Sequence, residues 1–141
     1  MDKRFWICGL VVSIAALLLD FLVHGLLLQG DYDALVARGL MRAPADAQHY
    51  LPYMLAAHLL LGYGLTWLYR QGVDRARPAV GQGLRFGAAI ALVATIPGYL
   101  IYYAVQPLPP ALVHKQLLFG SAATLLLGLL LAWLQPGRRA L

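Results

Sequence analysis

The sequence predicts an all-α protein, an up-down bundle of four transmembrane helices with both chain termini in the cytoplasm. Composition gives the first indication: 61% of the 141 residues are hydrophobic and 12% are charged, about half the charged share of a soluble domain. The apolar residues gather in four long segments, and most lysines and arginines lie beside alternate ends of these segments. A chain of this length has room for a single integral membrane domain, residues 1–141.

Four segments are long enough to cross a bilayer, which takes about 20 mostly apolar residues. They cover residues 5–28, 50–69, 86–106 and 115–134. The first segment could be taken for a signal peptide because Lys3 and Arg4 precede it. It is longer than the apolar part of a signal peptide and no small-x-small cleavage site follows it, so we expect it to remain as a helix.

The connections between the spans are short, so consecutive helices are expected to be antiparallel neighbours. The first connection contains a segment, 31–42, that begins with acidic residues and ends with arginine. This charge order suits a short interfacial helix that stops before Pro44. The connection 70–85 is polar, and 106–110 is rich in proline, which cannot continue a helix.

Basic residues predict the orientation. Eight of the lysines and arginines lie on the side of the termini and of the connection 70–85, and three lie on the other side. Cytoplasmic loops carry this excess, and Trp6, Trp67 and Trp133 fall on the same side, as interfacial aromatic residues do. The net charge of +5 is thus a topology signal, aided by contact with anionic lipid headgroups. It does not indicate a nucleic-acid partner.

Polar residues gather in the outer half of the predicted bundle. Asp20 is the only acidic residue inside a span, and hydrocarbon penalises ionisable side chains, so such a residue usually has a partner or a function. Asp20 and His58 lie equally far from the outer ends of the first two spans and are expected at about the same depth. The other candidate members of a ligand-binding or proton-relay site are His24, Tyr102, Tyr103 and Thr124.

This cluster is open to four interpretations. Asp20 could bond His58 or His24 and simply hold two helices together. The pair could instead form a proton-titratable binding site, open to the outer face, for a small carrier or a sensor. Haem b could be held by His24 and His58, or by His58 and His114, and aromatic residues near the rim could line a quinone pocket. A transition-metal site would draw on His24, His58 and His114, with His49 and Asp20.

Hydrolytic or nucleophilic catalysis finds little support in the sequence. Ser13 and Ser121 are the only serines, and neither lies in a nucleophile-elbow motif. Cys8, the single cysteine, excludes an intramolecular disulfide and is interpreted as a buried apolar-like residue rather than a catalytic thiol. The sequence therefore favours a protein that is not an enzyme.

Small residues recur at four-residue spacing in two spans. Gly120, Thr124 and Gly128 do so in the fourth span, and Gly9 and Ser13 do so in the first. Such spacing lets helix backbones approach closely. It favours packing within the bundle, with homodimerisation through the fourth span as the alternative.

Three short motifs carry a resemblance to a family. They are Leu19-Asp20-x-x-x-His24-Gly25 in the first span, Gly83-Leu-Arg-Phe-Gly87 at the start of the third, and Tyr102-Tyr103 near its outer end. Together they resemble small four-helix bacterial inner-membrane proteins in which an Asp or Gly and a His or Tyr occupy that first-span site. The resemblance implies the four-helix architecture and a bacterial inner membrane, and it brings no reaction with it.

These observations predict a non-enzymatic binding protein or accessory subunit of the bacterial inner membrane. We expect it to be embedded in the lipid bilayer and to work as a homo-oligomer or within a larger membrane complex. A proton-coupled carrier of a small solute or ion is the alternative function, and a haem- or quinone-binding redox protein is the second alternative.

Overall fold

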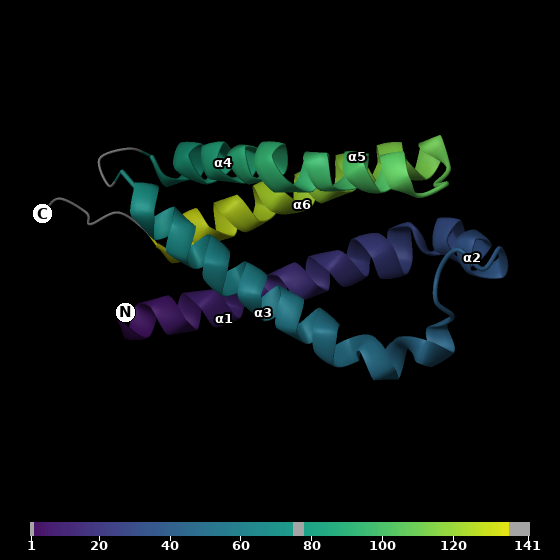
Figure 1. The fold of residues 1–141 in the computed structure, drawn as a ribbon. Coiled ribbons are helices and arrows are strands. Elements are labelled where there is room, and N and C mark those ends of the chain that lie inside the picture. Colours follow the sequence, from purple (N-terminus) through teal and green to yellow (C-terminus); the bar gives the residue numbers. More distant parts are fainter. Residues whose placement is uncertain (1, 75–77, 136–141) are drawn as a thin grey trace, which may run out of the picture.

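The structure is a computed structural model that describes residues 2–74 and 78–135. These residues form helices and no strands. Four helical stretches are long and apolar enough to cross a membrane: Lys3–Leu27, Pro44–Gly72, Ala79–Val105 and Pro110–Leu134. The predicted all-α fold with four long apolar helices is therefore confirmed. Figure 1 shows α1, α6 and the third span running lengthwise along the molecule, with α3 crossing α1 obliquely.

The first span changes helical type along its length. α1 (Lys3–Asp20) is α-helical, and the wider π-helical segment η1 (Phe21–Leu27) continues it. The chain then turns into the short helix α2 (Gln29–Ala37). π-helical turns are rare and are frequent at functional sites. η1, which contains His24, therefore draws attention to this end of the span.

The interfacial helix α2 ends earlier than predicted, at Ala37 rather than at residue 42. Gly39 adopts a left-handed backbone conformation, with φ of 69°. Leu40 N donates to Leu35 O and Gly39 N donates to Val36 O, both at 2.9 Å. These are the two hydrogen bonds of a Schellman cap, which glycine accommodates without strain. Gly39 ends the helix, and Pro44 comes only later.

The second and fourth spans are unbroken α-helices. The 3₁₀ turn η2 (Pro44–Asp46) leads into α3 (Ala47–Gly72), and α6 (Pro110–Leu134) forms the fourth span. α6 begins at Pro110 rather than at residue 115. Proline suits the first helical turn because the N–H that it lacks would have no intrahelical partner there.

The third span, like the first, contains a π-helical segment. It consists of α4 (Ala79–Ile90), η3 (Ala91–Thr95) and α5 (Ile96–Val105). η3 lies just before Pro97, which has no N–H to donate to the preceding turn, so the backbone widens there. The span begins at Ala79 rather than at residue 86, because Gln82 and Arg85 fit a helix although they are too polar for a hydrocarbon segment.

Small residues form the contacts between helices. α1 packs against α3, α4 packs against α6, and α6 also packs against α1. A Cβ added at Gly62 of α3 would overlap the backbone of Ser13 on α1. A Cβ added at Gly87 of α4 would lie 2.6 Å from the Thr124 carbonyl oxygen of α6. The small-residue positions in the first and fourth spans thus serve packing within one chain.

Two apolar clusters fill the interior. The larger lies among α1, α3 and α6, and its buried members include Val12, Ala16, Leu65, Tyr69, Leu127 and Leu131. The smaller one holds α2 against the start of α6 through Val23, Leu28, Leu35 and Leu112. Its Leu28, Leu35 and Leu112 are almost completely buried, so α2 is a packed element of the fold.

The second and third spans are not neighbours along their length, which corrects the expectation that consecutive helices pack together. Within the described ranges they meet near one end, where the rings of Tyr69 and Phe86 lie edge to face with centroids 5.2 Å apart. Beyond that point α3 crosses α1 and diverges from α5 (Figure 1). Since α3 packs mainly on α1 and the third span mainly on α6, the bundle separates at the end that carries α2, here called the α2 end.

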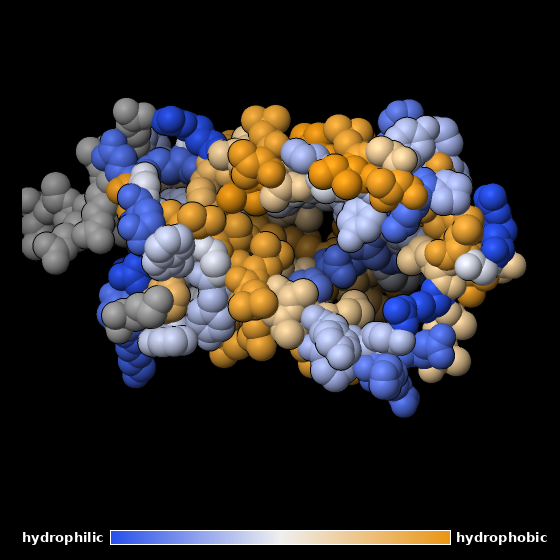
Figure 2. Space-filling view, viewed as in Figure 1, coloured by the Kyte–Doolittle hydropathy of each residue, from blue (hydrophilic) through white to orange (hydrophobic). Residues whose placement is uncertain are grey.

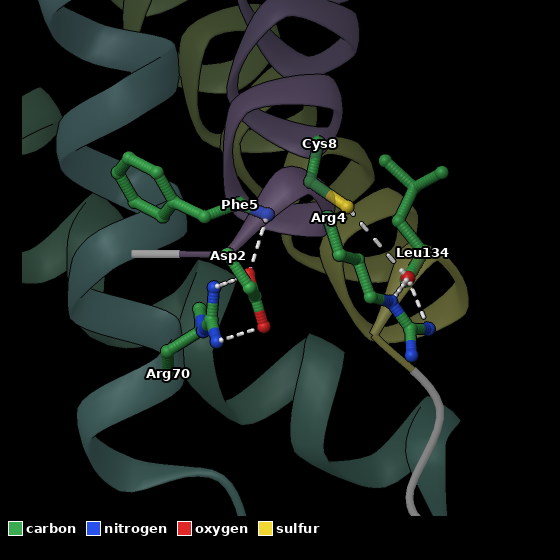
Figure 3. A network of polar contacts seen from close by, with 6 residues as sticks. All are labelled: Asp2, Arg4, Phe5, Cys8, Arg70 and Leu134. Carbon is green, nitrogen blue, oxygen red and sulfur yellow. Dashed lines mark hydrogen bonds and ion pairs between the residues drawn. The ribbon is translucent and has the colours of Figure 1, made fainter.

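Polar contacts join the helices at the opposite end, here called the Arg4 end (Figure 3). Asp2 caps α1 by accepting a hydrogen bond from Phe5 N at 2.9 Å, and its carboxylate accepts two more from the Arg70 guanidinium at 2.8 and 3.0 Å. Arg4 donates two hydrogen bonds, at 2.7 and 3.2 Å, to the Leu134 carbonyl at the end of α6. A cation is favourable at a helix C-terminus. These bonds tie α1 to both α3 and α6.

Cys8 also lies in this group. Its side chain is buried, and its thiol faces the Leu134 carbonyl oxygen at 3.8 Å (Figure 3). Ser13 is equally engaged in packing: its hydroxyl donates to the Gly9 carbonyl of its own helix at 2.8 Å and lies 3.4 Å from the Leu59 carbonyl oxygen of α3. In this structure both side chains serve helix contacts.

Candidate functional site

The candidate site lies at the α2 end and is centred on His24, which η1 presents to the interior. His24 Nδ1 lies 2.6 Å from the Tyr32 hydroxyl of α2, and His24 Nε2 lies 3.1 Å from the Tyr99 hydroxyl of α5. Tyr32 in turn accepts a hydrogen bond from Gln116 Nε2 of α6 at 2.8 Å. One imidazole therefore joins the first span, the interfacial helix and the third span, with the fourth span one bond further on.

The hydrogen bonds fix where the protons lie. Burial raises the pKa of the Tyr32 phenol, against the opposing effect of the hydrogen bond from Gln116, so this hydroxyl keeps its proton at neutral pH. Its oxygen already accepts from Gln116, and its proton is directed to His24 Nδ1. Neutral His24 then carries its own proton on Nε2. That proton faces Tyr99 and the carboxylate of Asp20.

Asp20 lies between two imidazoles. Its Oδ1 is 3.6 Å from His24 Nε2, one helical turn away, and its Oδ2 is 3.8 Å from His58 Nε2 of α3. The equal depth expected of Asp20 and His58 thus brings their side chains close together. Both separations exceed the usual hydrogen-bond length of about 2.7–3.2 Å. The three side chains are near neighbours with a small gap on either side of the carboxylate.

His58 presents a lone pair to this gap. Its Nδ1 lies 2.7 Å from the Met54 carbonyl oxygen, which only accepts hydrogen bonds, so the proton of neutral His58 is on Nδ1. The other nitrogen, Nε2, then has no proton and faces Asp20 Oδ2, which is also an acceptor. Two acceptors that face each other repel unless a proton or a hydrogen-bond donor lies between them. The gap calls for a proton, or for a ligand that donates hydrogen bonds.

The fourth span supplies a further unsatisfied acceptor and an ion pair. Gln116 is 7% exposed, and its Oε1 is buried without a hydrogen-bond partner. Beside it, Lys115 Nζ pairs with the Asp31 carboxylate of α2 at 2.8 Å. Lys115 therefore holds α2 in place, and its charge is already balanced by a carboxylate outside the site.

The site can be reached from outside the bundle. The side chain of Asp20 is 36% exposed, that of His24 27% and that of His58 13%. Figure 2 shows a hollow at the α2 end, between α5 and the diverging half of α3, with hydrophilic residues inside it and orange apolar residues around much of its edge. The separation of α3 from the third span exposes polar side chains that a closed bundle would cover.

The remaining predicted residues lie outside this network. Tyr102 and Tyr103 are 56% and 41% exposed on α5. Thr124 donates to the carbonyls of Gly120 and Ser121 on its own helix, at 3.0 and 2.9 Å. His114 is exposed at the start of α6. Of the predicted set, the structure brings together Asp20, His24 and His58.

Three residues of the network were not among the sequence candidates: Tyr32, Tyr99 and Gln116. Gln116 is a polar side chain in an apolar span and could have been noticed on that ground. Tyr99 is one of three tyrosines on α5, and the widened turn of η3 contributes to its direction. Tyr32 lies in a segment that the sequence marked only as interfacial. Its role depends on how α2 folds back.

The geometry weighs against haem ligation by these histidines. Both ring nitrogens of His24 are engaged by tyrosine hydroxyls, and the Asp20 carboxylate lies beside both His24 Nε2 and His58 Nε2, where iron would have to bind. Within residues 2–74 and 78–135, no group of three or more His, Cys, Asp or Glu side chains is arranged to hold a metal ion. The donor set suits protons and hydrogen-bonding ligands better.

No protein-family model matches the chain, and neither a curated protein nor a solved structure matches it. The resemblance drawn from Leu19-Asp20-x-x-x-His24-Gly25 therefore stays a prediction. The functional argument depends on the site itself.

Proposed function

We propose that this chain is a non-enzymatic, multi-pass membrane protein that binds a proton or a small hydrogen-bond-donating ligand between Asp20 and His58. The observation that carries the proposal is that Asp20 Oδ2 and the bare Nε2 of His58 face each other at 3.8 Å. His24 supports the carboxylate from the other side at 3.6 Å. Asp20 lies in a membrane span, where ionisable side chains are costly, and it faces a second hydrogen-bond acceptor, His58 Nε2.

The competing interpretation is that the polar network only holds the helices together. Asp20→Asn separates the two, because the asparagine amide can donate to His58 Nε2 and fill the gap permanently. If the gap exists to bind a proton or ligand, this variant stays folded and loses binding. If the network is only structural, the imidazole of His58 responds to pH in the same way in wild type and in Asp20→Asn.

The test is a pH titration of ¹⁵N-histidine-labelled protein in lipid nanodiscs, followed by NMR of the imidazole nitrogens. In wild type, the His58 Nε2 signal should move as the pair takes up a proton, and in Asp20→Asn it should stay unchanged. His49 and His114, which are exposed and lie outside the network, are recorded in both proteins as internal references. A wild-type His58 signal that does not change between about pH 5 and 9 contradicts the proposal.

The exposed position of the site favours a proton-coupled carrier as a second candidate. Asp20 is partly exposed at the α2 end, while the apolar core and the hydrogen bonds of Arg4 and Arg70 lie toward the other end. A carrier must open a central site to one side at a time. In proteoliposomes with a pH-sensitive dye inside, solute-dependent proton movement that Asp20→Asn abolishes would support a carrier. Equal movement in both proteins would remove Asp20 from transport.

We also propose that the Arg4 end faces the cytoplasm of a bacterial inner membrane. The excess of Lys and Arg on that side supports this orientation, and exposed Trp6, Trp67 and Trp133 lie toward the same end. Reporter fusions after residues 42 and 141 test it: alkaline phosphatase should be active at the first position and green fluorescent protein at the second. The reverse pattern contradicts the orientation.

Four spans make a small protein for transport, and we propose that it works as a homo-oligomer or within a larger membrane complex. Wide exposed apolar faces on all four spans leave room for lipid or protein contacts. Native mass spectrometry of gently extracted protein tests this. A multiple of the 15.4 kDa chain indicates a homo-oligomer, and stoichiometric foreign polypeptides indicate an accessory subunit. A single chain alone contradicts both.

A further inference from the structure

We infer that the ligand of the Asp20–His58 gap is a small organic ammonium ion, which binds through its N–H groups in place of a proton. The inference rests on the proposed function. It names a class of ligand and a fixed exchange between that ligand and a proton, which the function alone does not require.

The atoms on both sides of the gap accept hydrogen bonds, so a ligand that fits must donate two. The carboxylate of Asp20 and the Nε2 of His58 both offer lone pairs, and the proton of His58 is committed to the Met54 carbonyl. Their separation of 3.8 Å is short enough for one nitrogen with two hydrogens to reach both atoms. An alkylammonium group has N–H donors and a positive charge that matches the carboxylate. An anion has neither property.

The groups around the gap do not neutralise the Asp20 carboxylate, so a bound cation can balance its charge. On the first span, His24 directs its proton toward Tyr99 and Asp20. Tyr32 of α2 is protonated, and Lys115 of α6 is paired with Asp31. No uncommitted positive side chain from these elements faces Asp20 among the described residues. A cation bound here therefore meets one carboxylate and neutral acceptors.

Proton and ammonium exclude each other. A proton taken up on His58 Nε2 removes the lone pair that the ammonium needs, and a proton on Asp20 removes the negative charge. When an alkylammonium ion enters the protonated gap, its N–H groups donate to Asp20 Oδ2 and His58 Nε2, and the displaced proton passes to solvent. One positive charge enters the gap and one leaves it. The bond between the protein and the released proton is the only covalent bond of the protein that breaks.

The experiment measures proton release from wild-type protein in weakly buffered nanodiscs after addition of methylammonium chloride, adjusted to the same pH. At a pH where NMR shows the gap protonated, about one proton per chain should be released. Tetramethylammonium chloride is the matched probe, because it carries the same charge without N–H donors. Its effect should be at least about tenfold weaker at equal concentration, the loss expected when charge-assisted hydrogen bonds are removed.

Two variants locate the exchange. Asp20→Asn should release no proton, whereas Asp33→Asn, which removes an exposed carboxylate of nearby α2, should behave like wild type.

Equal release with both cations overturns the inference, because the site would then respond to charge alone. No release from a gap that NMR shows to be protonated also overturns it and leaves the proposed function standing. A gap that NMR never finds protonated overturns both. The comparison of the two cations needs only the wild-type chain.

Discussion

The two ends of the molecule differ in the hydrogen-bond partners of one aspartate at each end. At the α2 end, Asp20 lies between His24 and His58 with an unfilled gap beside it. At the Arg4 end, Asp2 has every partner that it needs: Phe5 N donates to it, and Arg70 donates twice. The carboxylate of Asp2 thus has hydrogen-bond donors within 3.0 Å, whereas the imidazole nitrogens beside Asp20 lie 3.6 and 3.8 Å away. Only the second arrangement leaves room for a ligand.

The Asp2 pair yields a prediction about pH. The hydrogen bonds from Arg70, followed by that from Phe5 N, hold the pKa of Asp2 well below its ordinary value of 3.8. Arg70→Gln should raise this pKa toward 3.8, as measured by NMR of the carboxyl carbon, whereas Arg38→Gln should leave it unchanged. A lowered folded-state pKa stabilises the protein above the unfolded pKa. The stability advantage of wild type over Arg70→Gln should thus be present above about pH 4 and vanish as pH falls through the lower pKa.

Helix contacts provide the clearest prediction at the scale of elements. Gly62 of α3 lies directly on the backbone of Ser13, with the Ser13 Cα 2.6 Å from the position of an added Cβ, whereas nothing lies within 4 Å of a Cβ at Gly64. Gly62→Ala should lower stability by about 1–3 kcal/mol, and Gly64→Ala should be neutral or stabilise by up to about 1 kcal/mol through helix propensity. Thermal unfolding in detergent, followed by circular dichroism, measures both. Equal melting temperatures would refute the close crossing.

One hydroxyl joins the short helix α2 to two spans. Tyr32 accepts from Gln116 and bonds His24, and it is the link from α2 to both spans. Tyr32→Phe should accelerate amide hydrogen exchange in α2 by about five- to thirtyfold, which corresponds to about 1–2 kcal/mol for the lost bonds. Tyr102→Phe, on the exposed face of α5, is the matched control. Unchanged exchange in Tyr32→Phe would mean that the apolar cluster of Leu28, Leu35 and Leu112 and the Lys115–Asp31 ion pair hold α2 without this hydroxyl.

The helices of the whole molecule pack as two pairs, α1 with α3 and α4 with α6. α1 and α6 join the two pairs, and α3 diverges from α5 toward the α2 end (Figure 1). This arrangement predicts a difference in order along α3. Spin labels at Met54 and Ile101, toward the α2 end, should give a broader distance distribution by double electron–electron resonance than labels at Leu68 and Leu84, near the ring contact of Tyr69 with Phe86. Equal widths would show that α3 is held as firmly at the α2 end as near the ring contact.

The sequence by itself determined the class of fold and the depth of its polar residues. Hydropathy and the length of a bilayer crossing are local properties, so four spans could be recognised, and helical rise was enough to bring Asp20 and His58 to one level. The predicted ends of the helices were less accurate than their number. Gln82 and Arg85 continue a helix beyond the apolar segment, and a left-handed Gly39 ends α2 before any proline does.

Only the tertiary structure decided which spans are neighbours and which side chains complete the site. Short connections predicted that the second and third spans would pack together, but close contacts at Gly62 and Gly87 direct α3 onto α1 and α4 onto α6 instead. The π-helical segments η1 and η3 then shift the register of the helices, so the residues that meet His24 do not follow from counting along an α-helix. Tyr32, Tyr99 and Gln116 lie on three different elements, and only their packing in space brings them together.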